Sequence, residues 1–598
     1  MTERRRKLNK GIETTLMIPM ELGEREATYD APWSIQQGRK INPDPLASVT
    51  LGVLRNWVDT CETEHQTCSS STAKKASLPT RVIDVESQDG QRIRLHEGAS
   101  QHGRYLALSH RWVSGPTPLW VTRRDNLEQR KLGFPLNTLP ATVVDAVRVA
   151  RSLGVRYVWI DSLCILQDSS EDWEVESSRM ADIYANADLT IFADCGRDDE
   201  HGFLRRRRSF PSTSVTLTAP DGGPVCVNVR KSFAASFKAS QFSSSQADLE
   251  TSHLSDRGWI FQERVLSRRI LHFAQSQLYW ECSEGTFGED GYVVLKRGLR
   301  ECGQHEVRFS KLSYGSILHD REPLSPSDFA AQWARLVQAY STLRLTREED
   351  KLPALAGLAA AFHSRAAAAN DGRYLAGVWE RCFADHLAWS ITNTKPERIH
   401  RVYQHRQYSD GSSGGRVEED TTFVHPGQLF PRPSVYRAPS FSWAAVDGEI
   451  EYHELKKPCV KLEDAEIDTS LSSPYGKPNG AHLTVSGPLR QARSYGPFEK
   501  DMGGVFCPRR AGYTPLYDAE GVAFGYLLLD SKDDVDERDV YCLKLGEPRY
   551  SGNIFLVLVC CDELDAAVSQ FRRIGLGLTR DAYKTLFDDA EVKTVSLV

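Results

Sequence analysis

Residues 105–112 read YLALSHRW, residues 139–154 read LPATVVDAVRVARSLG, and residues 156–168 read RYVWIDSLCILQD. A helical pattern, DWEVESSRMADIYANA at 172–187, and a further apolar run, LTIFAD at 189–194, complete this stretch. The chain here alternates apolar strands with amphipathic helices, which is typical of βαβ units and a parallel sheet. We therefore predict an α/β domain built around this stretch.

Polar residues follow two of these predicted strands at the point where each strand ends. Ser109, His110, Arg111 and Trp112 follow the first strand, and Asp161 and Ser162 follow the second. Because ligands in open α/β sheets bind at the carboxyl ends of strands, these side chains should share one edge of the sheet. The sequence predicts that the functional site lies at that edge.

The composition is that of an ordinary water-soluble globular chain. The protein has 598 residues, of which 40% are hydrophobic and 26% are charged, and its formal net charge is -6. No basic excess argues for a nucleic-acid surface, and no apolar run approaches the ~18 residues of a membrane span. The basic N-terminus lacks the apolar run of a secretory signal, and the 13 cysteines show no disulfide-like framework. We expect a multidomain protein of the cytoplasm.

Changes in pattern along the chain predict five regions. We expect a polar, disordered N-terminus, an N-terminal helix followed by a β-hairpin, the α/β domain, a mainly helical region and a β-rich C-terminal region. Their bounds are 1–45, 46–99, 100–290, 291–400 and 401–598. Within the last region we expect a flexible loop at 407–420, and FSWAAVD at 441–447 is among the short predicted strands.

Several phrases together resemble the fungal heterokaryon-incompatibility (HET) domain family in its extended form, from about Trp57 to the end of the chain. At the α/β stretch they are YLALSHRW, LPATVVDAV, YVWIDSLCILQDSSEDW, ESSRMADIYANADLTIFA and LSDRGWIFQERVLSRRILHF. Further along they are DKLPALAGLA, YLAGVWERCFADHLAW, APSFSWAAVDG and FRRIGLG. The chain departs from the family at His110, where Tyr-Cys-Trp or Tyr-Arg-Trp usually follows the serine, and at Val113, commonly glycine.

The resemblance implies a role in fungal non-self recognition and induced cell death. It also implies a flavodoxin-like α/β fold distantly related to TIR domains, many of which cleave the nicotinamide–ribose bond of NAD with a glutamate on a helix. This step from fold to chemistry is an analogy.

Glu176 is the candidate catalytic carboxylate under that analogy. It lies one turn before Met180 on the predicted helix. We favour it because a carboxylate beside the ribose can stabilise an oxocarbenium-like state. The apolar positions that we expect to mark the buried face of the helix are Val175, Met180, Ile183, Tyr184 and Ala187. The alternative is that Glu174 and Glu176 only interact favourably with the N-terminal end of the helix dipole.

The residues at the predicted sheet edge are the candidate nucleotide-binding residues. Asp161 and Ser162 could bind ribose hydroxyls or a phosphate, Arg111 could pair with a diphosphate, and Trp112 could stack on a base. Ser109 and His110 complete this set. The alternatives are that Asp161 caps the turn and that Arg111 and Trp112 only pack. A thiolate at Cys164 beside His110 is a further alternative, but its apolar surroundings favour a structural cysteine.

Two more clusters have both a structural and a functional interpretation. Arg257, Gln262, Glu263 and Arg264 could form an ion-pair network that fastens their segment to the α/β unit, or could reach a ligand phosphate. The spacing C-x3-H-x2-C of Cys61, His65 and Cys68 places three zinc-compatible side chains on one predicted helix. A closed zinc site needs a fourth ligand, which the sequence does not identify, and the spacing also suits packing, so we assign no metal.

Three functions are compatible with this sequence. The first is a cell-death effector that hydrolyses or cyclises NAD, which would be a substrate rather than a cofactor. The second is a non-catalytic signalling module that self-associates or binds a partner protein. The third is a family member recruited to small-molecule biosynthesis. We expect neither nucleic acid nor a membrane span among its interactions.

Overall fold

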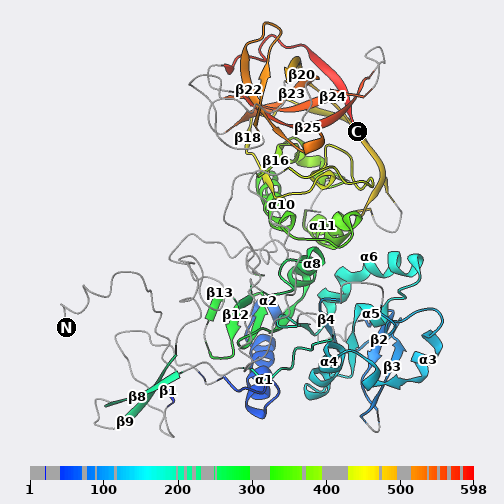
Figure 1. Ribbon diagram of the computed structural model, residues 1–598, viewed down its shortest axis with the longest axis vertical. Helices are drawn as coiled ribbons and strands as arrows, with labels where there is room; N and C mark the ends of the chain where they lie inside the picture. The colour runs from blue at the N-terminus through cyan, green and yellow to red at the C-terminus, as the bar shows by residue number, and fades with distance from the viewer. Residues whose placement is uncertain are drawn as a thin grey trace, which may run out of the picture. The chain divides into compact units, whose positions relative to one another are not determined.

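The computed structural model divides into two compact units, residues 1–321 and 322–598 (Figure 1). Each unit is described by itself. The described residues are 20–21, 39, 41–69, 77–87, 90–112, 118–196, 200–207, 212–218, 224–230, 248–249, 252–291, 293–296, 311, 324–366, 372–392, 429–469, 474–494, 513–534, 538–548, 552–561, 568–579 and 583–598. Val113 and the predicted loop at 407–420 lie outside them, as does most of the N-terminal region 1–45.

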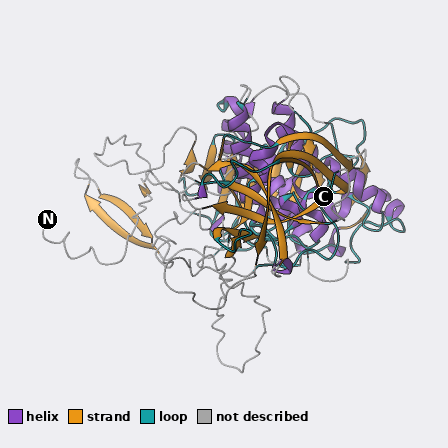
Figure 2. Ribbon diagram, turned by 90° about the horizontal axis from the view of Figure 1, so that it is seen from above, coloured by secondary structure: helices purple, strands orange, loops and turns teal. Residues whose placement is uncertain are grey.

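The first unit contains a ten-stranded sheet with the strand order β13-β12-β11-β10-β7-β4-β6-β2-β3-β5. In this order the strands are Val293–Lys296, Gly285–Gly288, Leu278–Cys282, Arg269–Phe273, Leu189–Phe192, Tyr105–Ser109, Tyr157–Trp159, Arg81–Asp84, Arg92–Glu97 and Phe134–Pro135. A separate antiparallel sheet consists of β1 (Met20–Glu21), β9 (Pro224–Arg230) and β8 (Ser212–Thr218), as Figure 2 shows by its colours.

The middle of the large sheet is parallel. Strand β4 pairs in parallel with β6 on one side and with β7 on the other, and β7 pairs in parallel with β10. The chain therefore runs from β4 outward to β6, and then crosses β4 to reach β7 and β10. This order, 2-1-3-4 in sequence numbering, is that of a flavodoxin-like sheet, and the predicted α/β fold is confirmed.

The helices that connect these parallel strands position the edge residues. Helix α4 (Ala141–Ser152) leads into β6, α6 (Ser170–Asn186) leads into β7, and α8 (Gly258–Leu266) leads into β10. Right-handed crossovers place α6 and α8 on the same face, because both connections run in the same direction across the sheet. Trp173 of α6 and Trp259 of α8 meet edge to face, with ring centroids 6.3 Å apart. Shorter helices are α1 (Ser48–Thr63), α2 (Gln66–Ser69), α3 (Leu127–Leu132), η1 (Leu136–Thr138) and α5 (Asp161–Cys164).

Antiparallel strands extend the sheet on both sides. The predicted N-terminal hairpin is present as β2 and β3, and β2 adds to β6 in antiparallel register, with Ile83 opposite Val158. On the other side β10, β11, β12 and β13 form successive antiparallel pairs. The N-terminal helix α1 buries Leu54, Trp57 and Cys61, whereas Val49 is exposed. One hydrophobic core joins α1 to the strands and to α4 and α6.

The second unit begins with helices packed around an aromatic cluster. The helices are α10 (Pro326–Ser341), η3 (Glu348–Lys351), α11 (Pro353–Ala366), η4 (Glu380–Cys382) and α12 (Phe383–Leu387), with η5 (Trp443–Ala445) and η6 (Lys532–Asp534) further along the chain. Trp333 of α10 lies 5.5 Å, centroid to centroid, from both Phe362 of α11 and Trp379. Two short strand pairs adjoin this cluster: β14 (Tyr374–Leu375) with β15 (Val378–Trp379), and β16 (Trp389–Ile391) with β17 (Ile450–Tyr452).

The rest of this unit is β-rich, as predicted. The strands are β18 (Leu455–Lys456), β19 (Lys461–Thr469), β20 (Pro478–Ser494), β21 (Tyr513–Tyr517), β22 (Ala523–Leu529), β23 (Arg538–Pro548), β24 (Ile554–Cys560), β25 (Gln570–Thr579) and β26 (Val592–Leu597). The pairings β20–β23–β24–β25–β22–β21–β20 close into a ring. The ring closes because the long strand β20 pairs with both β21 and β23. The same strand also pairs with β19 and β26.

The prediction of a strand at FSWAAVD is wrong. Residues Trp443–Ala445 form a 3-10 turn, and the Ser442 hydroxyl accepts a hydrogen bond from the backbone N–H of Ala444 at 3.1 Å. Residues 441–446 are buried, so the apolar run reflects burial on all sides rather than a strand.

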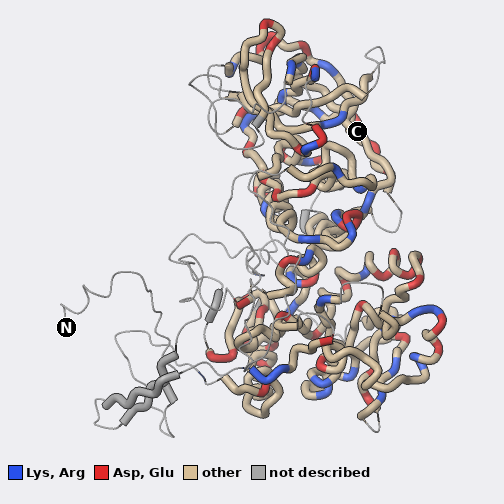
Figure 3. Tube along the Cα trace, in the orientation of Figure 1, with Lys and Arg blue, Asp and Glu red and all other residues tan. Residues whose placement is uncertain are grey.

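Basic and acidic residues are interspersed along both units (Figure 3). Among the described residues, no helix has the length and apolar character that a membrane span needs.

A buried arginine, Arg573 of β25, forms an ion pair within the β-rich region and also contacts the segment that contains β16. The guanidinium of Arg573 is fully buried, donates from Nε to Asp530 Oδ2 at 2.9 Å and from Nη1 to the carbonyl of Leu387 at 2.7 Å, and lies 3.5 Å above the centre of the Trp389 ring. Removing one partner of such a pair leaves a buried charge without compensation.

We therefore expect Arg573→Met to lower the free energy of unfolding by about 3–5 kcal/mol. The double variant Arg573→Met/Asp530→Leu should be less destabilised than the single one, since it removes both charges. Urea denaturation followed by tryptophan fluorescence measures both effects. Equal losses in the single and double variants would contradict this account of the pair.

Candidate functional site

The predicted edge residues of β4 and β6 come together in the structure. Trp112 donates from Nε1 to Asp161 Oδ2 at 2.9 Å, and His110 Nδ1 lies 3.8 Å from Asp161 Oδ1. The other contact of Asp161 is local, because its Oδ1 also accepts from the backbone N–H of Ser162 at 2.7 Å. Asp161 therefore makes one local hydrogen bond and also joins the two polar loops, but it does not cap the helix α5, which has no side-chain cap.

Three further edge residues differ in their surroundings. Ser109 and Ser162 are buried, and the hydroxyl oxygen of Ser162 has no hydrogen-bond partner among the residues that the structure describes, whereas the Ser109 hydroxyl interacts with Glu263 of α8. Arg111 is half-buried. Buried hydroxyls normally find a protein partner or an ordered water, so Ser162 leaves hydrogen-bonding capacity open at this edge.

Glu176, and not Val175 as predicted, lies on the buried face of α6. The predicted buried face of α6 included Val175, but Val175 is 43% exposed and Glu176 is 1% exposed. The buried face is Glu176, Met180, Ile183 and Tyr184, which follows the helical spacing i, i+4, i+7, i+8. A carboxylate thus takes the place of a core residue on this stripe.

The carboxylate of Glu176 is incompletely satisfied. Its Oε1 lies 3.7 Å from Nη1 of Arg179, and its Oε2 has no hydrogen-bond partner within the described part of the chain. Burying a carboxylate without full pairing is costly, and such groups concentrate at functional sites. The simple explanation by the helix dipole does not account for this burial.

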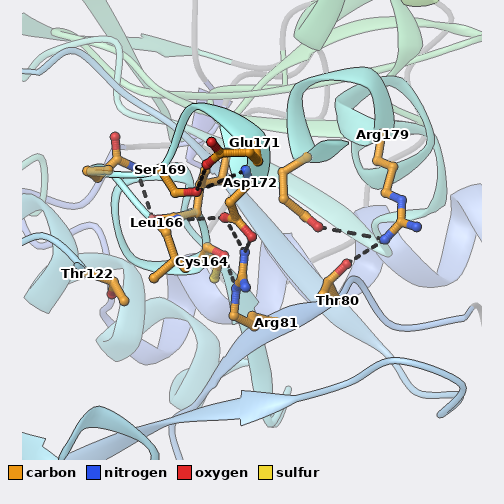
Figure 4. Close-up of polar contacts among 12 residues, drawn as sticks. Thr80, Arg81, Thr122, Cys164, Leu166, Ser169, Glu171, Asp172 and Arg179 are labelled. Carbon is orange, nitrogen blue, oxygen red and sulfur yellow. Dashed lines mark hydrogen bonds and ion pairs between the residues drawn. The ribbon is translucent and has the colours of Figure 1, made fainter. Parts of the chain in front are cut away.

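The start of α6 is held in place by an arginine from β2 (Figure 4). Arg81 donates from Nη2 to Asp172 Oδ1 at 2.7 Å and from Nε to the carbonyl oxygen of Cys164 at 2.6 Å. Asp172 Oδ2 also accepts from the backbone N–H of Leu166 at 2.8 Å, and Ser169 caps the helix. These bonds fix the position of Glu176, one turn further along the helix.

The same surroundings place Glu176 near the carboxyl end of β6. Arg179 donates to the hydroxyl of Thr80 at 2.7 Å (Figure 4). Because β2 and β6 are antiparallel with Ile83 opposite Val158, Thr80 lies just beyond Ile160, at the level of Asp161. Glu176 and Asp161 therefore share the end of this strand.

A second carboxylate, Glu263 of α8, is buried at this edge, whereas the sequence predicted it only as part of a structural ion-pair network. It lies close to the hydroxyls of Ser109 and Tyr184. Burial raises the pKa of Glu263 to about 7, although the Ser109 hydroxyl and the Arg257 guanidinium oppose the rise. A carboxyl group with such a pKa can both accept and donate a proton near neutral pH.

The arginines of the predicted ion-pair network also have partners outside their own segment. Arg264 pairs with Glu281 of β11, Nε to Oε2 at 2.7 Å, and Arg257 donates from Nη1 to the carbonyl oxygen of His110 at 2.8 Å. Both arginines fasten α8 to the α/β unit. Glu263 instead lies at the sheet edge, and its Oε2 has no hydrogen-bond partner among the described residues. The available signal was the run Gln262–Arg264 inside an otherwise apolar helix, which is buried nearly all round.

Cys164 is a structural residue, as its apolar surroundings predicted. It is fully buried, and burial raises the pKa of its thiol to about 12. The charges of Glu176 and Asp161 add to this rise, which shows that both carboxylates lie within electrostatic range of the thiol. A protonated thiol is a poor nucleophile.

The edge as a whole has the chemistry of a polar-ligand site. Three buried oxygens lack hydrogen-bond partners in the described structure, namely Ser162 Oγ, Glu176 Oε2 and Glu263 Oε2, and the Ser109 hydroxyl interacts with the Glu263 carboxyl group. With Asp161, three carboxylates surround the ends of β4 and β6. This arrangement can bind hydroxyl groups, stabilise developing positive charge and transfer a proton.

The cysteine–histidine motif of α1 lies elsewhere in the same unit. Cys61, His65 and Cys68 converge, and the ligand atoms of all three lie within 4.8 Å of one another and of the thiol of Cys282. Cys282 is the fourth side chain that the sequence could not identify, because it ends β11, 217 positions after His65.

The fold and this edge define a flavodoxin-like α/β protein with a carboxylate-rich site at the ends of its parallel strands. Residues 105–263 match the family model of the heterokaryon incompatibility protein (HET). The match begins at the first residue of β4 and ends at Glu263, so it spans the edge site, and this segment of the chain is a HET domain. No curated protein and no solved structure matched the chain.

The pKa of Glu263 leads to a pH prediction. Its folded value of about 7 exceeds its ordinary value of 4.5, so the folded protein binds this proton more tightly than the unfolded chain does. The resulting stability is fully present below pH 4.5 and is lost as the pH rises to about 7. We expect the free energy of unfolding of the wild type to fall over this window by up to about 3 kcal/mol relative to Glu263→Gln.

Urea denaturation at a series of pH values measures this difference. Glu174→Gln, which changes an exposed glutamate on α6, is the matched control and should follow the wild type. Parallel pH curves for the wild type and Glu263→Gln would show that Glu263 does not hold its proton in this way.

Proposed function

We propose that this HET-domain protein acts in fungal non-self recognition and cell death by cleaving the nicotinamide–ribose bond of NAD or a related nucleotide. The observation that carries this proposal is the set of three buried oxygens without partners among the described residues around the ends of β4 and β6: Ser162 Oγ, Glu176 Oε2 and Glu263 Oε2. A ribose supplies the hydroxyl donors that such oxygens need, and a glycosidic bond supplies the positive charge that a buried carboxylate stabilises.

The proposed reaction begins with loss of nicotinamide. When the C–N bond breaks, the bonding electrons go to the ring nitrogen, nicotinamide leaves as a neutral molecule, and the ribose becomes an oxocarbenium-like cation. Glu176 is the carboxylate that stabilises this cation or captures it covalently. Its second oxygen is available for this role, because Arg179 approaches only the first.

The second step needs a base. Water adds to the ribose carbon and loses a proton, and Glu263 is the proposed acceptor because its pKa of about 7 leaves much of it ionised near neutral pH. Asp161 and the two buried serines are the proposed partners of the ribose hydroxyls. Arg111 is the proposed partner of the diphosphate, and Trp112 the proposed stacking surface for a base.

Access is the main requirement of this proposal. Glu176 is 1% exposed, so a nucleotide reaches it only if α6 moves relative to the sheet. The proposed enzyme is therefore inactive in this conformation and becomes active by a rearrangement, which fits a cell-death effector whose activity must be controlled.

The same burial supports a second candidate function of a different class. A HET domain whose carboxylate stays enclosed would act without catalysis, as a module that self-associates or binds a signalling partner. The two candidates differ in whether nicotinamide is released.

The experiment measures nicotinamide release from NAD by the purified full-length protein at low concentration and at concentrations that favour assembly. We expect release by the wild type and a loss of about a hundredfold or more in Glu176→Gln, the size of effect seen when an electrostatic stabiliser of a transition state is removed. Glu174→Gln makes the same charge change two residues away at an exposed position and should retain activity.

Two outcomes would contradict the proposal. Equal release by the wild type and Glu176→Gln would remove Glu176 from the site. No release by the wild type in dilute or assembled form would exclude NAD cleavage and favour the assembly module. Light scattering would then measure the self-association of the protein.

A further inference from the structure

Four metal-binding side chains from distant parts of the first unit converge at one point. Cys61 lies on α1, His65 follows that helix, Cys68 lies on α2, and Cys282 is the last residue of β11. One ligand atom from each lies within 4.8 Å of all the others. The three thiols are buried and His65 is half-buried.

The distances agree with a tetrahedral centre. With Zn–S bonds of about 2.3 Å and a Zn–N bond of about 2.0 Å, a sulfur and a nitrogen ligand lie roughly 3.6 Å apart. Cys282 Sγ lies 3.5 Å from His65 Nδ1. The side chains are therefore already arranged as they would be around an ion.

Ordinary packing does not explain this arrangement. Cys61, Cys68 and Cys282 are part of a hydrophobic core, as Cys164 and Cys542 are, and burial alone is ordinary for a cysteine. Here three thiols and an imidazole share one point. A disulfide would join two of the thiols and leave the third thiol and the imidazole unexplained.

The surroundings carry the positive charge that a thiolate centre requires. Three thiolates around a divalent ion have a net charge of about -1. Arg269 lies beside Cys61, and Lys311 lies within electrostatic range of Cys282, Cys68 and Cys61. The Lys311 ammonium is buried without a hydrogen-bond partner in the described structure, so a nearby negative centre would offset the cost of its burial.

The backbone around the cluster is also fixed. Arg268 donates from Nη2 to the carbonyl oxygen of Cys68 at 3.0 Å, and the Thr67 hydroxyl donates to Glu284 Oε1 at 2.6 Å. His65 stacks on Phe287 with ring centroids 6.3 Å apart. Such surrounding contacts orient metal ligands and restrict the geometry of a site.

We propose that Cys61, His65, Cys68 and Cys282 bind one zinc ion and that this ion fastens the N-terminal helices to the β11–β12 hairpin. Zinc suits three thiolates and one imidazole in tetrahedral geometry. All four positions are filled by protein side chains, so the site is structural and takes no substrate. Binding releases the thiol protons to solvent, and because the ligands lie 217 positions apart, the ion stabilises the folded chain.

The first test is the zinc content of the full-length protein, purified without chelators under reducing conditions. Inductively coupled plasma mass spectrometry measures the zinc bound per chain. We expect one zinc ion per chain in the wild type and none in Cys282→Ser. Cys382→Ser is the matched control, because Cys382 is also buried, with Sγ 3.4 Å from His386 Nδ1, but belongs to no cluster of three or more ligands among the described residues. This variant should keep its zinc.

The second test does not depend on the folding of a variant. Removal of zinc from the wild type with a chelator should lower its melting temperature, and added zinc should restore it. Cobalt in place of zinc should give the visible absorption of a tetrahedral site and a thiolate charge-transfer band.

Three outcomes would overturn the proposal. They are a reduced wild-type protein that contains no zinc and takes up none when zinc is added, full zinc content in Cys282→Ser, and a melting temperature unaffected by removal of the ion. Each is independent of nicotinamide release, so failure here and failure of the proposed function are distinguishable.

Discussion

The position of β4 between β6 and β7 is the constraint on which the rest of the α/β unit depends. Strand β4 pairs in parallel with both neighbours, so the chain must cross back over it after β6. That crossing brings α6 and α8 to one face and turns the buried side of α6 toward β4, where the Tyr105 hydroxyl donates to the carbonyl oxygen of Ile183 at 2.6 Å. The polar loops after β4 and β6 then meet at a single edge, together with carboxylates from both helices.

The carboxylates at this edge lower the stability of the core. Glu176 and Glu263 each occupy a buried helix position where an apolar side chain would add stability, and both retain an oxygen without a partner among the described residues. The structure holds them through neighbours: Arg81 and Asp172 fix α6, and Arg257 fixes α8 by its bond to the His110 carbonyl. These contacts hold α6 and α8 in place although each helix buries a poorly satisfied carboxylate, which is costly.

Local patterns in the sequence were sufficient to predict the parallel sheet, the N-terminal hairpin and the residues at the ends of β4 and β6. They failed where burial is decided by distant contacts. Val175 is exposed and Glu176 is buried, the reverse of the expected pattern. The Glu176 carboxylate forms its ion pair with Arg179, whose guanidinium is held by the distant Thr80. FSWAAVD is buried without being a strand, and Glu263 and Cys282 reach their sites only through the long-range order of the sheet. No spacing rule links Cys282 to a motif 217 positions earlier.

Strand β11 connects the two polar centres of the unit. Successive side chains of a strand point to opposite faces, so Trp280 and Cys282 face α1, while Glu281 faces α8. Trp280 stacks on Trp57 with ring centroids 6.1 Å apart, and Cys282 joins the thiol cluster. Glu281 binds Arg264 and also lies 3.1 Å from His272 Nε2. Helix α8, which carries Glu263, is therefore anchored to one face of β11, and the thiol cluster lies on the opposite face. A zinc ion bound by the cluster would make this support more rigid without contacting a ligand at the carboxylate edge.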